Sequence, residues 1–134
     1  MTPRYLMTTG GPNSMAETDR RAPSRGEVWL VAMGAARKGE LGKNRPAVVV
    51  SQDGLQSGSQ YDHITVIPLS ASRPPKLLQP SVEPEAGLKR ASVAICDFPR
   101  ACVSSRFLQR LGSVSDETLS AIVQARAVIE GWDD

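Results

Sequence analysis

The stretch Gly42-Lys43-Asn44-Arg45-Pro46-Ala47-Val48-Val49-Val50-Ser51 decides the fold of this 134-residue chain. A basic approach leads into four apolar residues, and the last three of them are valines. β-branched residues without polar atoms favour a central strand that is covered on both faces. Pro46 has a fixed φ and biases Arg45 toward an extended backbone. The stretch therefore predicts a buried strand with Arg45 at its start, where the guanidinium can be held in place to bind a phosphate. An ordinary strand beside a solvated arginine is the alternative interpretation.

Size and composition are those of a single globular domain. Of the 134 residues, 40% are hydrophobic and 22% are charged, which suffices for one buried core. Only 4% are aromatic, which argues against a base-stacking platform built on aromatic rows. The formal net charge of +2 permits contact with nucleic acid without requiring it. No apolar run approaches the length of a membrane span, so we expect a cytoplasmic protein.

The cysteines and the histidine do not follow a metal-site pattern. Cys96 and Cys102 fit neither a redox pair nor a zinc pair, and His63 is the only histidine. We therefore expect two buried, reduced thiols, no metal and no cofactor.

The order of patterns along the chain predicts a mostly β domain, part barrel, with one closing helix. Residues 1–24 are polar and have little to bury, so we expect a disordered leader before a domain at residues 25–132. Met7 and Met15 are alternative start sites. Strand patterns occupy residues 25–33, 46–51, 63–70 and 92–96, with weaker ones at 77–82, 101–103 and 110–114. Pro68 predicts a sheet edge or bulge, and residues 107–108 predict a short turn of helix.

The helix is expected near the end of the chain. Ser115 is a good N-cap, and acidic residues follow it in the first turn. Gly131 is expected to end the helix. The apolar stripe expected to face the core consists of Leu119, Ile122, Val123 and Ile129.

Several strand ends carry side chains suited to phosphate chemistry: Glu40, Arg45, Ser70, Arg73 and Arg100. An arginine, a hydroxyl and a carboxylate suffice to cleave RNA by its own 2′-hydroxyl, because that nucleophile is already tethered beside the phosphorus. The same groups are also suited to binding a phosphate backbone without cleaving it.

Residues 25–29, 38–51 and 66–70 together resemble the MazF/PemK toxins of type II toxin–antitoxin systems. The segment from Arg90 through Arg100, Leu111-Gly112-Ser113-Val114 and the closing helix resemble the second half of the same family. The resemblance covers about residues 25–131.

The resemblance implies an SH3-like, CcdB/PemK-like β-barrel with a C-terminal helix, usually a homodimer. It also implies a metal-independent, sequence-specific endoribonuclease that leaves a 2′,3′-cyclic phosphate and a 5′-hydroxyl. The family's arginine falls on Arg45, its preceding glutamate on Glu40 and its catalytic threonine on Ser70. Ser70 keeps the hydroxyl but lacks the methyl group that stiffens χ1. The residues expected to bind RNA are Lys43, Ser72, Arg73 and Arg100.

The family also implies a partner, a MazE-like antitoxin with an acidic segment that enters the basic groove. DNA is then contacted only through the antitoxin complex. Where the family often has an aspartate this chain has Ala91, and Phe98-Pro99 replaces a polar–apolar pair, so the cleavage sequence does not follow from the resemblance.

Two alternatives stand beside the nuclease. Gyrase-binding toxins of the CcdB group rely on a tryptophan near the C-terminus, and this chain ends Gly131-Trp132-Asp133-Asp134. An inactive paralogue that still binds antitoxin is the second alternative.

Overall fold

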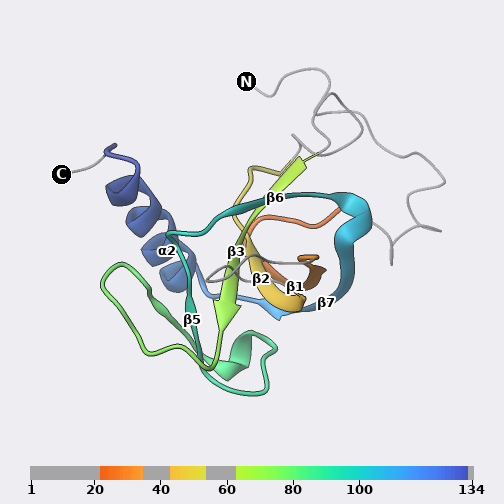
Figure 1. Cartoon of the computed structure of the whole chain (residues 1–134), viewed down its shortest axis with the longest axis horizontal. Helices are drawn as coiled ribbons and strands as arrows, with labels where there is room; N and C mark the ends of the chain where they lie inside the picture. Colours follow the sequence, from red (N-terminus) through yellow and green to blue (C-terminus); the bar gives the residue numbers. More distant parts are fainter. Residues whose placement is uncertain (1–21, 35–42, 54–62, 133–134) are drawn as a thin grey trace.

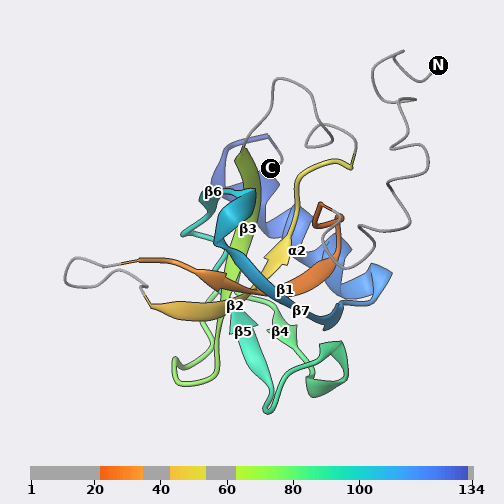
Figure 2. The ribbon, with the colours of Figure 1, turned by 90° about the vertical axis from the view of Figure 1, so that its right-hand side faces the viewer.

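The computed structural model describes residues 22–34, 43–53 and 63–132. Among these residues, seven antiparallel strands form one curved sheet in the order β4-β5-β3-β2-β1-β7, and β6 pairs with β3. The strands curve round while the C-terminal helix α2 lies along one side (Figures 1 and 2). This is the mostly β, partly closed barrel with a C-terminal helix that the sequence predicts.

The strand bounds largely confirm the predicted ones. They are β1 Glu27–Ala32, β2 Asn44–Val49, β3 His63–Ser70, β4 Ser81–Val82, β5 Ser92–Ala94, β6 Arg100–Val103 and β7 Phe107–Ser113. The weak pattern at residues 77–82 yields only the two residues of β4. The helical turn expected at residues 107–108 lies earlier, at η4 Ser104–Arg106. Phe107 instead opens β7 opposite Val31, because its ring packs edge-on against Trp29.

The valines of β2 are buried on both faces of the sheet, as predicted. Val48 belongs to a core with Val28 and Ile67 that extends to the helix, here called the helix-side core. Val49 belongs to a second core with Trp29 and Val31, here called the Trp29 core. Successive residues of a strand point to opposite faces, so the sheet separates these two cores.

Pro68 lies where β3 changes partner. Its neighbour on one side is Ala47 of β2. On the other side, β3 pairs with β6 up to Val66 and with β5 from Leu69 onward. A residue without an N–H costs no ladder hydrogen bond at such a junction. The predicted irregularity at Pro68 is therefore an exchange of neighbouring strands.

Helix α2 spans Asp116–Ile129 and is capped as predicted by Ser115, whose Oγ accepts a hydrogen bond of 3.1 Å from the Thr118 N–H. Its predicted apolar stripe is partly wrong. Ile122 and Ala125 are buried, but Val123 and Ile129 are each 37% exposed. The helix touches the sheet along a narrow line, and its C-terminal end points away from the strands (Figure 1).

Both cysteines are free and buried, as expected. None of the helices in the described part of the chain combines the length and the apolar character that a membrane crossing requires.

Candidate active site

The start of β2 and the end of β3 bring two of the predicted catalytic residues together. The register pairs Ala47 with Pro68 and Val49 with Val66. The pairing ends at Ala47 and Pro68; Arg45 lies two residues before Ala47, and Ser70 lies two residues after Pro68. Opposite residues of an antiparallel pair share a face, so both side chains leave the face of the Trp29 core. The guanidinium of Arg45 and the hydroxyl of Ser70 thus belong to the same face at the same end of the two strands.

Ser70 and Ser72 differ sharply in exposure. Ser70 is only 2% exposed, whereas Ser72 is exposed. Their Oγ atoms lie 3.4 Å apart, which is long for a hydroxyl pair. Of these two neighbouring hydroxyls, only that of Ser72 is open to solvent.

Arg100 is placed on the same face but further along β3. It opens β6 opposite Val66, four residues before Ser70. Its Nη2 donates to the carbonyl oxygen of Met33 at 3.0 Å, and its guanidinium carbon lies 5.9 Å from the centre of the Phe98 ring. These two contacts hold the Arg100 side chain against the protein.

Two other predicted residues lie just beyond the strand ends, Lys43 before β2 and Arg73 after β3. Lys43 is exposed, and its N–H donates to the carbonyl of Gly34 at 2.8 Å, which extends the β1–β2 ladder. Arg73 is half-buried in the segment after Ser72. Glu40 lies outside the described residues, in the segment that Gly34 and Lys43 flank.

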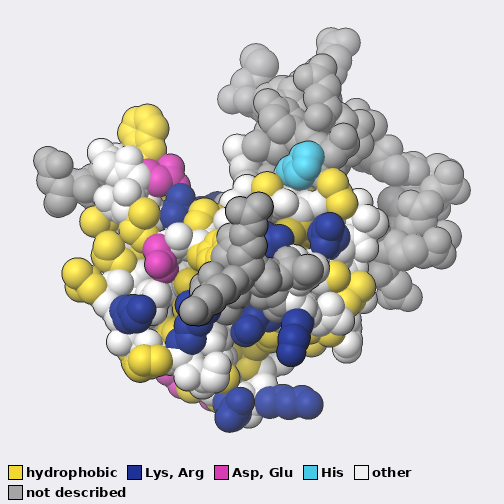
Figure 3. All heavy atoms as spheres, in the orientation of Figure 1, with side chains coloured by type: hydrophobic (Ala, Val, Ile, Leu, Met, Phe, Trp, Pro, Cys, Tyr) yellow, Lys and Arg dark blue, Asp and Glu magenta, His cyan; other side chains and the backbone are white. Residues whose placement is uncertain are grey.

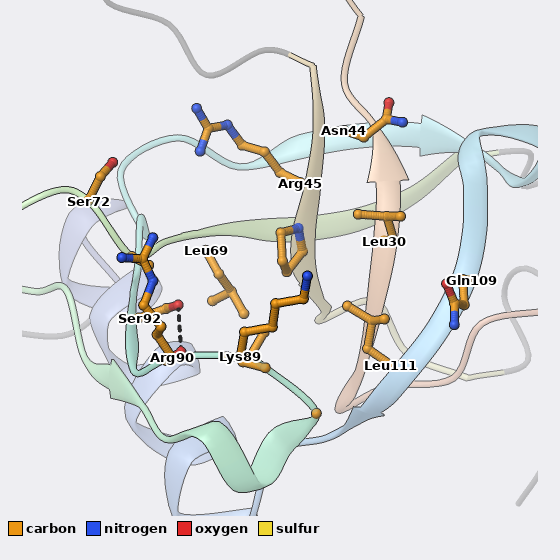
Figure 4. A pocket seen from close by; sticks show the side chains of 14 residues that line it. Leu30, Asn44, Arg45, Leu69, Ser72, Lys89, Arg90, Ser92, Gln109 and Leu111 are labelled. Atoms are coloured by element: carbon orange, nitrogen blue, oxygen red, sulfur yellow. Dashed lines mark hydrogen bonds between the residues drawn. The ribbon is translucent and has the colours of Figure 1, made fainter.

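A pocket of about 540 Å³ opens on the opposite face of the same strand ends. Its floor is apolar and continues the helix-side core, being formed by Leu30, Pro46, Leu69 and Leu111. Arg45 and Ser72 lie at its rim, so the pocket and the Arg45–Ser70 pair adjoin at the end of the sheet. In the close view the Arg45 side chain turns away from the Leu30, Leu69 and Leu111 side chains of the floor (Figure 4).

The wall of the pocket is the segment that joins η3 (Pro84–Ala86) to β5, and it contributes Lys89 and Arg90. A close backbone contact fixes this wall against β7. A Cβ atom at Gly87 would lie 2.1 Å from the Leu111 carbonyl oxygen, and one at Gly112 would lie 2.2 Å from that of Ala86. Only glycines allow the two chains to approach in this way.

Sequence reasoning missed Lys89 and Arg90 as site residues. The sequence does show two adjacent cations shortly after Gly87. Their place in the same pocket as Arg45 depends on a backbone contact with Gly112, which lies far along the chain. In the space-filling view, Lys and Arg side chains spread over the middle and lower part of the visible face, with few carboxylates among them (Figure 3).

The cysteines are unsuited to act as nucleophiles. Burial raises the pKa of the Cys96 thiol to about 11, and burial likewise raises the pKa of Cys102 despite the nearby Arg100. Both thiols are therefore protonated at neutral pH. In the described part of the chain, no three His, Cys, Asp or Glu side chains gather in a way that could hold a metal ion.

Residues 24–129 match the model of a family described as the PemK-like, MazF-like toxin of type II toxin–antitoxin systems. Among solved structures, the chain is similar to MazF of Deinococcus radiodurans, with 18% identity and a TM-score of 0.70 over 83% of this chain and 98% of that one. It is also similar to a mycobacterial endoribonuclease in complex with its cognate antitoxin, with 20% identity and a TM-score of 0.66 over 82% and 96% of the two chains. The Mycobacterium tuberculosis toxin MazF-mt6 gives 17% identity and a TM-score of 0.65 over 81% and 98%.

Proposed function

Because the chain belongs to the PemK-like, MazF-like toxin family of type II toxin–antitoxin systems, we propose that it is a metal-independent endoribonuclease that cleaves single-stranded RNA. The observation that supports the proposal is the β2–β3 register, because Arg45 and Ser70 extend it by two residues on one face at one end of the sheet. The toxin domain is assigned to residues 25–132. The mycobacterial neighbour named as an endoribonuclease supports the same activity.

The proposed reaction is an internal transfer of the phosphodiester. The 2′-oxygen bonds to the neighbouring phosphorus while the bond from phosphorus to the 5′-oxygen breaks. The 2′-hydroxyl loses its proton and the leaving 5′-oxygen gains one, so the products are a 2′,3′-cyclic phosphate and a 5′-hydroxyl. The tethered nucleophile leaves the protein with orientation, proton transfer and charge stabilisation.

Each residue has a role in this scheme. Arg45 holds the two non-bridging phosphate oxygens through its planar fork. Ser70 adds a directed hydrogen bond, which requires the Ser72 segment to move aside because Ser70 is buried. Glu40 is the candidate proton acceptor. Arg73, Arg100, Lys43 and Ser72 contact the RNA backbone, and Arg100 does so while held by Met33.

The test is cleavage of a long mixed RNA pool by purified protein in EDTA, followed by sequencing of the ends. We expect defined cuts that end in a cyclic phosphate. Arg45→Ala should slow cleavage by about 100-fold to 1,000-fold, the usual effect of losing one transition-state donor. Absence of cuts by the wild type at enzyme concentrations above the RNA would refute the nuclease.

The proposed partners are a second copy of the chain, as homodimer, and an acidic antitoxin segment in the cytoplasm. The toxin neighbours seen in complex with an antitoxin support the second partner. The basic face in Figure 3 is complementary to an acidic segment. DNA is contacted only through the antitoxin.

One observation favours the gyrase-binding alternative. Trp132 is 82% exposed although its N–H is anchored to the Ala127 carbonyl at 2.8 Å. Large exposed aromatic residues are typical anchors of protein interfaces. Toxicity that persists in Arg45→Ala but is lost in Trp132→Ala would favour this alternative over the nuclease.

A further inference from the structure

The floor of the pocket is a row of side chains across three neighbouring strands. Leu30 of β1 lies between Pro46 of β2 and Gln109 of β7, each its direct partner in the sheet. Asn44, two residues before Pro46, and Leu111, two after Gln109, extend the same face. The result is an aliphatic surface with two carboxamides, Asn44 at the start of β2 and Gln109 within β7.

The polar groups divide between the two sides of the mouth. Asn44 and Gln109 stand on one side in the close view, whereas Arg90 and Ser72 stand on the other, and Lys89 reaches over the floor (Figure 4). Asn44, Gln109, Lys89 and Arg90 are all exposed. The described lining contains no carboxylate. A ligand with a flat apolar body, a hydrogen-bonding edge and a negative group would match the aliphatic floor, the two carboxamides and the two cations respectively.

We propose that this pocket is a nucleobase subsite beside the cleavage site, where Asn44 and Gln109 read the edge of one base and Lys89 and Arg90 hold its phosphate. The inference rests on the proposed ribonuclease function. Arg45 and Ser72 belong to the rim, so the pocket adjoins the strand end from which the Arg45 side chain extends, and the base next to the reacting phosphate would enter the pocket over that end.

The pocket chemistry favours a base over an acidic peptide. Carboxamides carry a donor and an acceptor in one plane, which matches the paired groups on a base edge. The volume of about 540 Å³ is in the usual range for small-molecule sites and is compact for a peptide segment. The aliphatic floor packs against a base face without the aromatic stacking that sequence-independent binding relies on.

The first experiment sequences the cut sites of wild-type protein, Gln109→Leu and Asn44→Leu on the same RNA pool. We expect preference at one base next to the cut to fall by about 5-fold to 150-fold in each variant, the discrimination that one paired contact supplies. Gln124→Leu, on the exposed side of α2, is the matched control and should keep the wild-type pattern. An unchanged base preference in Gln109→Leu and Asn44→Leu would overturn the proposal.

The second experiment does not require cleavage. Nucleoside 5′-monophosphates are titrated into wild-type protein while the side-chain amide signals of Asn44 and Gln109 are followed by NMR. We expect one base to shift these signals at lower concentration than the other three, and ribose 5-phosphate to leave them in place. If all four nucleotides and ribose 5-phosphate shift the signals equally, the pocket binds only the phosphate and the proposal is overturned.

The two experiments separate failure of the subsite from failure of the nuclease. If wild-type protein does not cut RNA yet one mononucleotide shifts the amide signals, the subsite stands and the nuclease falls. If an Asp/Leu-rich peptide shifts the signals and no nucleotide does, the pocket is a peptide site and the proposal is overturned.

Discussion

A hydroxyl that contacts a reacting phosphate needs both the right position and access to the substrate. Ser70 and Ser72 each have one of these two properties. Ser70 lies at the strand end on the same face as Arg45 but is buried, whereas Ser72 is exposed. The Oγ–Oγ distance of 3.4 Å is too long for a strong hydrogen bond between them. A contact that a hydroxyl makes only in the transition state raises kcat rather than substrate affinity.

Replacing each serine by alanine separates these roles. We expect Ser70→Ala to lower kcat by about 100-fold with little change in KM, because a transition-state donor is lost. Ser72→Ala should change kcat by less than about 10-fold, because an exposed hydroxyl is replaced by water. Single-turnover cleavage of a defined RNA measures both variants. A larger loss in Ser72→Ala than in Ser70→Ala would assign the phosphate contact to Ser72.

Glu27 is a buried carboxylate whose partners hold it in the charged form. Burial raises its pKa, but hydrogen bonds from the Ser24 N–H, Trp29 Nε1 and Arg110 outweigh burial, so the pKa lies below its ordinary value of 4.5. Arg110 Nε lies 2.8 Å from the carboxylate. A lowered pKa in the folded state means that these contacts stabilise the fold above the ordinary pKa of glutamate.

The contribution of Glu27 should therefore depend on pH. We expect Glu27→Gln to lower the free energy of unfolding at pH 7 by about 1–3 kcal/mol, the value of hydrogen bonds to a charged group. The difference from wild type should shrink as the pH falls through the lowered pKa of the folded state, because the wild-type carboxylate then becomes protonated. Urea unfolding at pH 7 and at pH 3 measures it, and a difference that grows at pH 3 would contradict the lowered pKa.

At the scale of elements, the contact between Gly87 and Gly112 joins the pocket wall to β7. Gly112→Ala tests this contact alone, since only Gly87 of the two has a positive φ. We expect a loss of about 1–3 kcal/mol in unfolding free energy, as for an overpacked core. The amide NMR signals of residues 88–90 should also shift. Gly131→Ala is the control for these signals, because its Cβ would meet no atom within 4 Å; its positive φ makes alanine locally strained there, but the signals of residues 88–90 should stay unchanged.

Helix α2 packs through a narrower line than its sequence predicts. Ile122→Ala should cost about 2–5 kcal/mol, because a fully buried side chain is removed. Val123→Ala, one residue away, should change the unfolding free energy by less than about 0.5 kcal/mol, because Val123 faces solvent. Chemical unfolding of dilute protein compares the two. A large cost for Val123→Ala would mean that another chain covers this side of the helix.

The elements differ in how far the sequence predicts them. The valines of β2 predict a two-sided strand because β-branching and burial agree locally. The stripe of α2 was misjudged because periodicity gives the apolar face of a helix but not how much of it the sheet reaches. Phe107 was assigned to a turn because its partner Trp29 lies in another strand. The assignment of Arg45 and Ser70 follows from their positions at strand ends and stays a prediction, whereas the placement of Lys89 and Arg90 depends on a glycine contact between distant segments.

At the scale of the whole molecule, a net charge of only +2 is distributed unevenly. Arg110 and Arg126 form ion pairs with Glu27 and Glu130. Lys89 and Arg90 are instead exposed at the pocket, where the described lining has no carboxylate. Local charge of this kind attracts a polyanion even though the molecule as a whole is nearly neutral.

RNA affinity should therefore vary with salt as expected for a few phosphate contacts. With Arg45, Lys89 and Arg90 each neutralising one phosphate, log K against log salt should have a slope of about −2 for a single strand. Lys89→Ala should make the slope less steep by about 0.7. Gln109→Leu should weaken binding with the slope unchanged, because no charge is removed. Fluorescence anisotropy with an RNA carrying 2′-deoxyribose at the cut site measures binding without cleavage, and an unchanged slope in Lys89→Ala would place the phosphates elsewhere on the basic face.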